Sequence, residues 1–276
     1  MTYSASNFRP SAKINRLAFS LGQPGFTLIE LLVVIAIIAV LAGLGHAAYS
    51  SAIGKAQMSS EIAASKTLAT AYHAAAADNG GKFPAAYDTN AKGLIGSDGK
   101  PLKMKFAGHG YAFRLAPYFN YAIDDTLLVS GNKQQIQKDG WLPGSFYYDY
   151  IVSRYPSFGI NYKFVGGVAG EIDEGVIRNT AQATAPIIIF ASARETLEKS
   201  EEESKSESEL IAGYAYVGAP SNPDDFKLVD ARHSGKAVVA FLDGSTRLMT
   251  IDELKDMRLW SMRAAQANDP NYSPGK

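Results

Sequence analysis

The pattern of hydrophobic and polar positions is dominated by one long apolar run near the N-terminus. From Phe26 to Gly45 there are 20 residues, and only Thr27 and Glu30 among them are polar. A helix of this length, with a rise of about 1.5 Å per residue, spans roughly the 30 Å hydrocarbon core of a bilayer. We therefore expect a membrane-spanning helix over residues 26–46. Glu30 is unusual in its first turns, because a carboxylate in that environment needs a partner.

The helical pattern continues beyond the apolar run, over residues 47–80. Apolar or small residues recur there at spacings of four and three, which places on one helix face Met58, Ile62, Ser65, Ala69, Tyr72 and Ala76. The other face is expected to carry Lys55, Ser59, Glu61, Lys66 and Thr70. Asp78-Asn79-Gly80-Gly81 predicts the helix end, because glycine readily forms a left-handed cap. The pattern favours one helix of roughly fifty residues, and it leaves open a bend near Gly43 or Gly45.

Residues 81–276 are predicted to form a globular α+β head, in which the long helix packs on an antiparallel sheet. The predicted elements after residue 81 are a turn at 97–101, a short helix over 111–119 that Pro117 stops, strands at 186–190 and 210–217, and a hairpin around Asp243-Gly244. The hairpin is the strongest of these signals, because Asp-Gly between two β-rich runs favours a tight turn.

Two segments of the head have unusual compositions. Eight aromatic residues lie between Phe146 and Phe164. We expect them to pack over the sheet, and sugar stacking by Tyr147 and Tyr148 is the alternative. Residues 195–209 hold seven glutamates and two lysines, which predicts a surface loop with little to bury.

Charge and composition narrow the function further. The chain has 27 basic and 27 acidic residues, so no nucleic-acid partner is expected. Residues 1–25 contain Arg9, Lys13 and Arg16 and no acid, and this basic segment before an apolar helix predicts a cytoplasmic N-terminus and an extracytoplasmic head. Cysteine is absent, which excludes disulfides and every cysteine-based metal, redox or nucleophilic site.

The six residues Gly25-Phe26-Thr27-Leu28-Ile29-Glu30 resemble the processing site of type IV prepilins and type II secretion pseudopilins. The resemblance implies that a prepilin peptidase removes residues 1–25 by cutting after Gly25 and then methylates Phe26. It also implies that Glu30 docks the subunit against the N-terminus of a neighbour in a filament. An ordinary signal anchor, or a secretory signal cut near Gly45–Ala48, is the alternative.

The C-terminal part carries a second pattern, in which His233 precedes Asp243-Gly244 by ten residues. This His-x9-Asp-Gly spacing resembles the signature of a bacterial group of prepilin-like proteins. A base–orienter pair or two metal ligands are conceivable chemistries. We favour a structural role, with Asp243 in the turn and His233 hydrogen-bonded to a loop before the hairpin.

The remaining candidates for chemistry are sparse. The other histidines, His46, His73 and His109, form no metal-binding or triad spacing. No cofactor is expected, although a calcium site is an alternative, with ligands drawn from Asp224, Asp225 and Asp230.

These observations together predict a pilin-like or pseudopilin precursor that is not an enzyme but the substrate of one. Its expected partners are a prepilin peptidase, other pilin or pseudopilin subunits, an inner-membrane assembly platform and the membrane. It is expected to be a single-pass protein of the bacterial inner membrane that then enters a periplasmic or surface filament. Two alternatives are a membrane-anchored glycan-binding module that does not polymerise and an anchored hydrolase that uses His233. The sequence leaves open whether the machine is a pilus, a secretion pseudopilus or a DNA-uptake system.

Overall fold

The computed structural model describes residues 26–171, 173, 175–196, 211–212, 216–217 and 229–273. The elements in these ranges are α1 (Leu28–Asp78), η1 (Lys105–Gly108), α2 (Ala112–Leu115), η2 (Ala116–Phe119), α3 (Ile123–Thr126), α4 (Asn132–Lys138), α5 (Tyr148–Arg154), β1 (Phe158–Asn161), η3 (Thr180–Gln182), β2 (Ile188–Ser192), β3 (Glu195–Thr196), β4 (Ile211–Ala212), β5 (Tyr216–Val217), β6 (Lys236–Phe241), β7 (Thr246–Thr250), α6 (Ile251–Leu254), η4 (Met257–Leu259) and α7 (Met262–Ala267).

The chain divides into two compact units, residues 1–50 and 51–276, and α1 contributes to both. In the first unit the large apolar side chains of α1 are exposed, as at Leu28 (83%) and Leu44 (67%). The helix is long and apolar enough to cross a membrane. The predicted helix is therefore present, and it runs without interruption for 51 residues.

Helix α1 ends where the glycines predicted it. Gly80 and Gly81 have positive φ angles of 61° and 82°. The Gly81 N–H donates to the Ala76 carbonyl at 2.8 Å, which closes the wide turn of a Schellman cap. The buried face of α1 also follows the predicted spacing, since Ser65, Ala69, Tyr72 and Ala76 are all buried.

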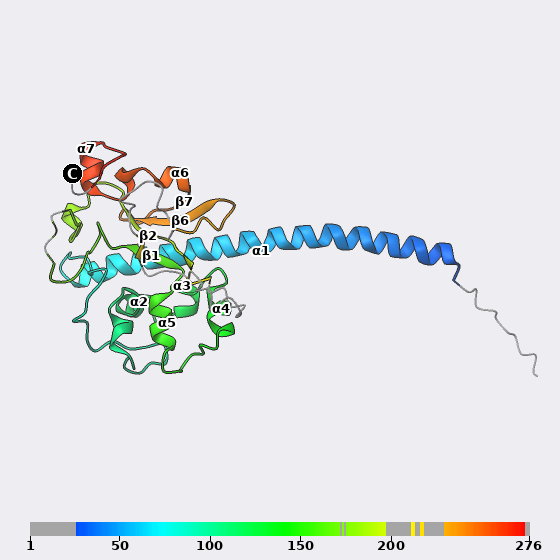
Figure 1. Cartoon of the computed structure of the whole chain (residues 1–276), viewed down its shortest axis with the longest axis horizontal. Helices are drawn as coiled ribbons and strands as arrows, with labels where there is room; N and C mark the ends of the chain where they lie inside the picture. The colour runs from blue at the N-terminus through cyan, green and yellow to red at the C-terminus, as the bar shows by residue number, and fades with distance from the viewer. Residues whose placement is uncertain are drawn as a thin grey trace, which may run out of the picture. The chain divides into compact units, whose positions relative to one another are not determined.

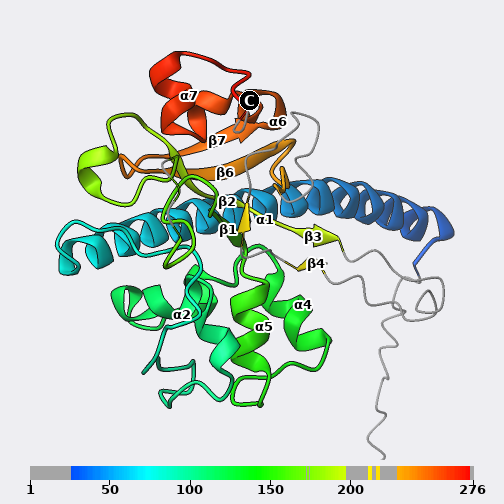
Figure 2. The same cartoon turned by 60° about the vertical axis from the view of Figure 1, so that its left-hand side comes forward.

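The head contains a sheet of five strands in the order β5-β1-β2-β6-β7. Strands β1, β2, β6 and β7 pair antiparallel, which confirms the predicted arrangement. The β6–β7 hairpin is in register through pairs such as Val238 with Leu248. The short strand β5 differs, because it pairs parallel to β1 at the edge of the sheet. Helices α2, α4 and α5 lie on one side of the 51–78 part of α1, and the hairpin with α6 and α7 lies on the other (Figures 1 and 2).

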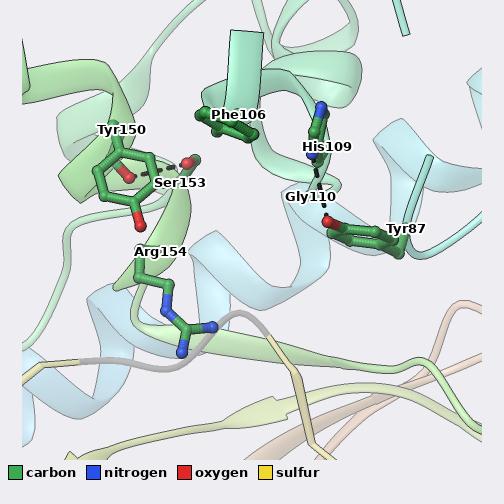
Figure 3. A pocket seen from close by; sticks show the side chains of 7 residues that line it. All are labelled: Tyr87, Phe106, His109, Gly110, Tyr150, Ser153 and Arg154. Atoms are coloured by element: carbon green, nitrogen blue, oxygen red, sulfur yellow. Dashed lines mark hydrogen bonds between the residues drawn. The ribbon is translucent and has the colours of Figure 1, made fainter. Parts of the chain in front are cut away.

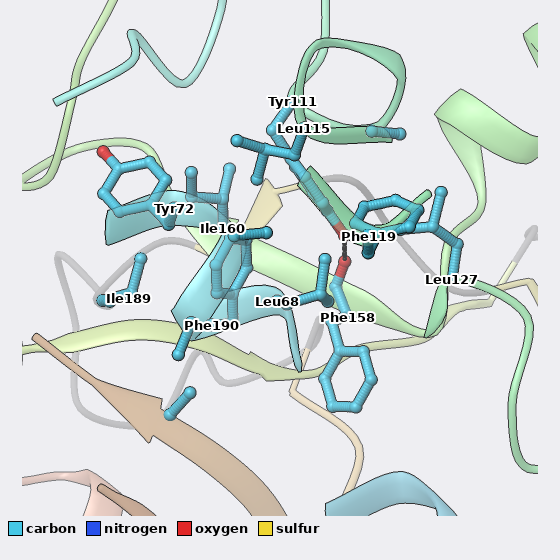
Figure 4. Packing of buried hydrophobic residues seen from close by; sticks show 14 of the residues in the cluster. Leu68, Tyr72, Tyr111, Leu115, Phe119, Leu127, Phe158, Ile160, Ile189 and Phe190 are labelled. Atoms are coloured by element: carbon cyan, nitrogen blue, oxygen red, sulfur yellow. Dashed lines mark hydrogen bonds between the residues drawn. The ribbon is translucent and has the colours of Figure 1, made fainter. Parts of the chain in front are cut away.

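One face of the sheet packs against α1 in the larger hydrophobic core (Figure 4). Leu68 and Tyr72 of α1 are both fully buried in it, next to Phe190 of β2. The Tyr72 ring meets the Phe190 ring edge-on, with centroids 5.9 Å apart. Tyr111 also lies in this core, and its hydroxyl donates to the Phe158 carbonyl at 2.5 Å. The helix is thus fixed to the sheet by aromatic packing rather than by small aliphatic contacts alone.

The opposite face of the sheet forms a second core with the C-terminal helices. Alternation along β6 divides its side chains, so that Val238 lies in the first core and Val239 in the second. Trp260 is fully buried in the second core, and its indole N–H donates to the Leu254 carbonyl at 2.8 Å. The sheet is therefore covered on both faces.

Several local expectations are corrected by the structure. Helix α2 ends at Leu115, shortly before Pro117, as predicted, but the chain continues into η2, whose end is formed by Asn120 with a φ angle of 52°. The aromatic segment does not lie mainly over the sheet, since Tyr148 begins α5. Its members are divided between core and surface: Tyr148 is 2% exposed, whereas Tyr147 is 47% exposed. Helical spacing explains the division, because residues adjacent in a helix point to different faces.

The loop before η4 supplies a carboxylate whose charge should affect stability. Hydrogen bonds from the Arg258 side chain, at distances down to 2.7 Å, hold the pKa of Asp256 below its ordinary value. Its stabilising contribution is present above the unfolded-state pKa of about 3.9 and is lost as the pH falls through the lower folded-state pKa. Asp256→Asn should therefore cost no more than about 1 kcal/mol at pH 7. The wild type and the variant should converge in stability at lower pH, as measured by denaturant unfolding with tryptophan fluorescence.

Candidate functional site

The predicted processing site lies at the start of α1, and Gly25 itself is outside the described residues. Thr27 and Glu30 form a capping box: the Thr27 backbone N–H and hydroxyl each lie 2.9 Å from Glu30 Oε2, and the Glu30 N–H donates to Thr27 Oγ1 at 3.2 Å. Phe26 is 80% exposed immediately before them. In the uncut chain, the carboxylate that needed a partner thus receives hydrogen bonds from its own helix end.

The C-terminal signature residues have separate partners. Asp243 is a turn residue, as predicted, because its carboxylate accepts the Ser245 N–H at 2.8 Å. Gly244 follows with a φ angle of 79°, a conformation that favours glycine. His233 lies elsewhere, and its ring Nε2 is 2.9 Å from Oε2 of Glu61 on α1. The prediction that His233 bonds a loop was wrong about the partner, since its ring binds the long helix.

Glu61 is the centre of a buried polar cluster that the sequence reading placed on the exposed helix face. Its side chain is fully buried. Oε1 accepts the hydroxyl of Ser192 on β2, and Oε2 accepts the hydroxyl of Ser130. The His233 ring is the third polar group at this carboxylate, with Nε2 at 2.9 Å from Oε2. Arg232 Nε lies 3.3 Å from Oε1 and adds a positive charge.

The sequence prediction missed Glu61 because it assigned only one row of helix positions to the buried face. Met58, Glu61, Ser65, Leu68 and Tyr72 also follow one another at spacings of three, four, three and four. This stripe runs into the core, so a charged residue at its second position must be paired or pay a large desolvation cost. An acidic residue inside a buried stripe was the signal available in the sequence.

A second layer of charges lies beside Glu61. Asp230 Oδ2 is 2.9 Å from Arg194 Nε and 3.4 Å from Arg232 Nε. The Arg232 side chain is only 9% exposed, and its terminal nitrogen also donates to the Ser157 carbonyl at 2.8 Å. Two guanidinium groups against Asp230 leave an environment that disfavours a calcium ion there. The other calcium candidates, Asp224 and Asp225, lie outside the described residues.

The backbone beside this cluster is strained. Ser130 and Ser234 have positive φ angles of 56° and 52°, which side-chain-bearing residues rarely adopt. Each such residue costs on the order of 1–3 kcal/mol and persists only where surrounding contacts hold it. For Ser130, the bond of its hydroxyl to Glu61 is one such contact.

A separate pocket of about 190 Å³ lies among η1, α5 and the loop at Tyr87 (Figure 3). Phe106, Tyr150 and Arg154 line it, and the Tyr87 hydroxyl lies 3.2 Å from His109 Nδ1. Tyr147 and Tyr148, the residues proposed for sugar stacking, are not among its lining residues.

The remaining histidines lie apart from the cluster. His46 is exposed on α1, and the His73 ring packs edge-on against Phe83. Within the described ranges, no group of three or more His, Cys, Asp or Glu side chains is arranged to hold a metal ion.

The comparison with known families bears on the N-terminal segment. Residues 21–45 match the family model described as the prokaryotic N-terminal methylation motif. No curated protein and no solved structure matches the chain. The match, together with the apolar helix and the α+β head, supports a membrane-anchored precursor of the type IV pilin or pseudopilin kind, which is cleaved and methylated. It does not reach the His233–Gly244 region, so the C-terminal signature stays a prediction.

Proposed function

We propose that the protein is the precursor of a pilin-like or pseudopilin filament subunit that a prepilin peptidase cleaves after Gly25 and methylates at Phe26. The observation that carries this proposal is the methylation-motif match over residues 21–45 at the start of a helix able to cross a membrane. Such a helix can do more than anchor the protein, because its exposed apolar side chains can leave the lipid and pack against the helices of neighbouring subunits.

In this proposal Glu30 sets the stagger between subunits. Cleavage creates an α-amino group on Phe26, four residues before Glu30 and directly before the Thr27 cap of the helix. Glu30 can then pair with the amino group of a neighbouring subunit, since an ion pair inside an apolar filament core is favoured over an isolated carboxylate. Other subunits and an inner-membrane assembly platform are the implied partners.

The proposed route begins in the inner membrane of a bacterium. The basic residues before Phe26 favour a cytoplasmic N-terminus, which leaves the head on the extracytoplasmic side. Assembly then moves the subunit into a filament of a type II secretion or type IV pilus system.

We also propose that the chain is a substrate of enzymes rather than an enzyme. His233 and Asp243 bond to different groups, Glu61 and Ser245, and so do not form a base–orienter pair with each other. The buried position of His233, 8% exposed at the side chain, suits a structural role.

The test is the intact mass and N-terminal peptide of the protein purified from its native membrane. We expect a chain that begins at methylated Phe26. A chain beginning at Met1 or near Ala47 would contradict the filament route and leave an anchored or secreted head.

A further inference from the structure

A larger pocket, of about 550 Å³, opens beside the Glu61 cluster in the head. Its polar wall is formed by the side chains of Lys55, Arg194, Arg232, His233, Ser130 and Ser234. Among the side chains that the structure describes, no aspartate or glutamate lines it. The surface that a ligand would meet therefore combines these cationic and hydroxyl-bearing groups with Ser51, Gln57 and the apolar side chain of Met58.

Within the described part of the chain, the carboxylates nearest to this wall do not cancel its charge. Lys55, Arg194 and Arg232 supply three positive charges, and Glu61 and Asp230 supply two negative ones. The sum is one positive charge with neutral His233 and two with the imidazolium. Among the described residues, Lys55 has no acidic partner within 4.0 Å. A concave site of one sign concentrates its field and attracts an anion.

The contacts between the two arginines and the carboxylates are mainly ionic. Arg194 Nε and Arg232 Nε are buried, and neither has an aligned hydrogen-bond acceptor within the described part of the chain. Both nevertheless lie within ion-pair distance of a carboxylate, at 2.9 Å from Asp230 and 3.3 Å from Glu61. The attraction is therefore ionic, without the directional bond that buried donors normally make. Because the Nε atoms are themselves buried, an anion in the pocket would be attracted by the charge of the two guanidinium groups rather than by these two donors.

We propose that this pocket binds a phosphate group. A single carboxylate can be satisfied by one arginine, whereas phosphate carries nearly two negative charges and several acceptor oxygens. Such an anion can be met at once by Arg194 and Lys55 at the rim and by Arg232 farther in. Arginine suits this task because its planar fork binds phosphate oxygens in pairs. The site belongs to the head and does not depend on cleavage after Gly25.

The experiment is a titration of the full chain, in maltoside micelles, with inorganic phosphate. Binding is followed by calorimetry up to about 50 mM phosphate, with sodium chloride keeping the ionic strength constant. We expect saturable binding by the wild type. In Arg194→Gln and in Lys55→Gln the dissociation constant should rise about tenfold, which corresponds to about 1.4 kcal/mol.

Lys66→Gln is the matched control, because Lys66 is exposed on the same helix and does not line the pocket. It should bind phosphate like the wild type. Thermal unfolding without phosphate verifies that each variant is folded. Lys55 is exposed and forms no ion pair with a described residue, so Lys55→Gln tests the site even if Arg194→Gln is unstable. Absence of saturable binding, or equal affinity in all three variants, overturns the proposal.

A second arm distinguishes a free phosphate from a lipid headgroup. The titration is repeated in maltoside micelles containing phosphatidic acid, a lipid whose headgroup is a phosphate monoester with a charge close to that of inorganic phosphate. Loss of phosphate binding in the wild type supports the site and assigns it to the headgroup. Unchanged binding supports the site and assigns it to a free phosphate-bearing solute.

Discussion

Glu61→Ala should lower the free energy of unfolding of the protein by about 3–5 kcal/mol. The variant leaves the His233 ring, the Arg232 guanidinium and two serine hydroxyls facing a hole in the core, with their shared acceptor gone. For a head of this size the melting temperature should fall by roughly 6–20 °C. Thermal or denaturant unfolding of the full chain in detergent, followed by fluorescence of buried Trp260, measures the loss.

Lys66→Ala is the control for this prediction, because it shortens an exposed side chain of the same helix. It should change stability by less than about 0.5 kcal/mol. The variants Glu61→Ala and His233→Ala can then be combined, and a coupling energy of about 0.5–3 kcal/mol is expected since the two side chains touch. If Glu61→Ala unfolds like Lys66→Ala, the cluster does not anchor the helix.

Gly25→Ala should leave the full-length precursor in the membrane, with residues 1–25 still attached and Phe26 unmethylated. The reason is that the processing motif places the cut directly after a glycine, at Gly25. Glu30→Ala should have the opposite profile: normal cleavage, but a large loss of filaments, since the partner of the Phe26 amine is gone. Mass spectrometry of the N-terminal peptide measures cleavage and methylation. The yield of filaments in sheared fractions measures assembly.

This pair of variants separates the two steps of the proposed route. Normal processing of Gly25→Ala would contradict cleavage at this position. Filaments of normal yield in Glu30→Ala would remove the docking role of Glu30 and leave the cleavage site intact.

The long helix and the hairpin were predictable because their signals are local. The apolar run from Phe26, the terminating Gly80-Gly81 pair and the Asp243-Gly244 turn each specify an element within a few residues. The head between them was less predictable. Tyr148 looked like a strand residue by composition but begins α5, and β5 joins the sheet parallel to β1, a pairing between distant segments that no local pattern encodes.

Of the two groups of candidate functional residues, the processing site at the start of α1 was predictable and the Glu61 cluster was not. The carboxylate at Glu30 follows a recognisable motif, whereas Glu61 looks like an ordinary surface residue of an alanine-rich helix. Its hydrogen-bond partners are 69, 131 and 172 residues away in the sequence. Hydrophobic periodicity indicates which face is buried, but it does not tell which distant side chains will neutralise a charge placed there.

The positions of these partners in the sequence also determine when α1 can complete its contacts during folding. Among the described residues, the buried carboxylate on α1 is satisfied by groups at Ser130, Ser192, Arg232 and His233. During synthesis the helix therefore emerges long before its last partner, and contacts of such long sequence separation form late. Docking of the helix on the sheet is completed only after the segment just before the final hairpin has been made. In a subunit truncated before residue 232, α1 could still make apolar contacts with the residues before that point. Its buried Glu61 would then lack both Arg232 and His233.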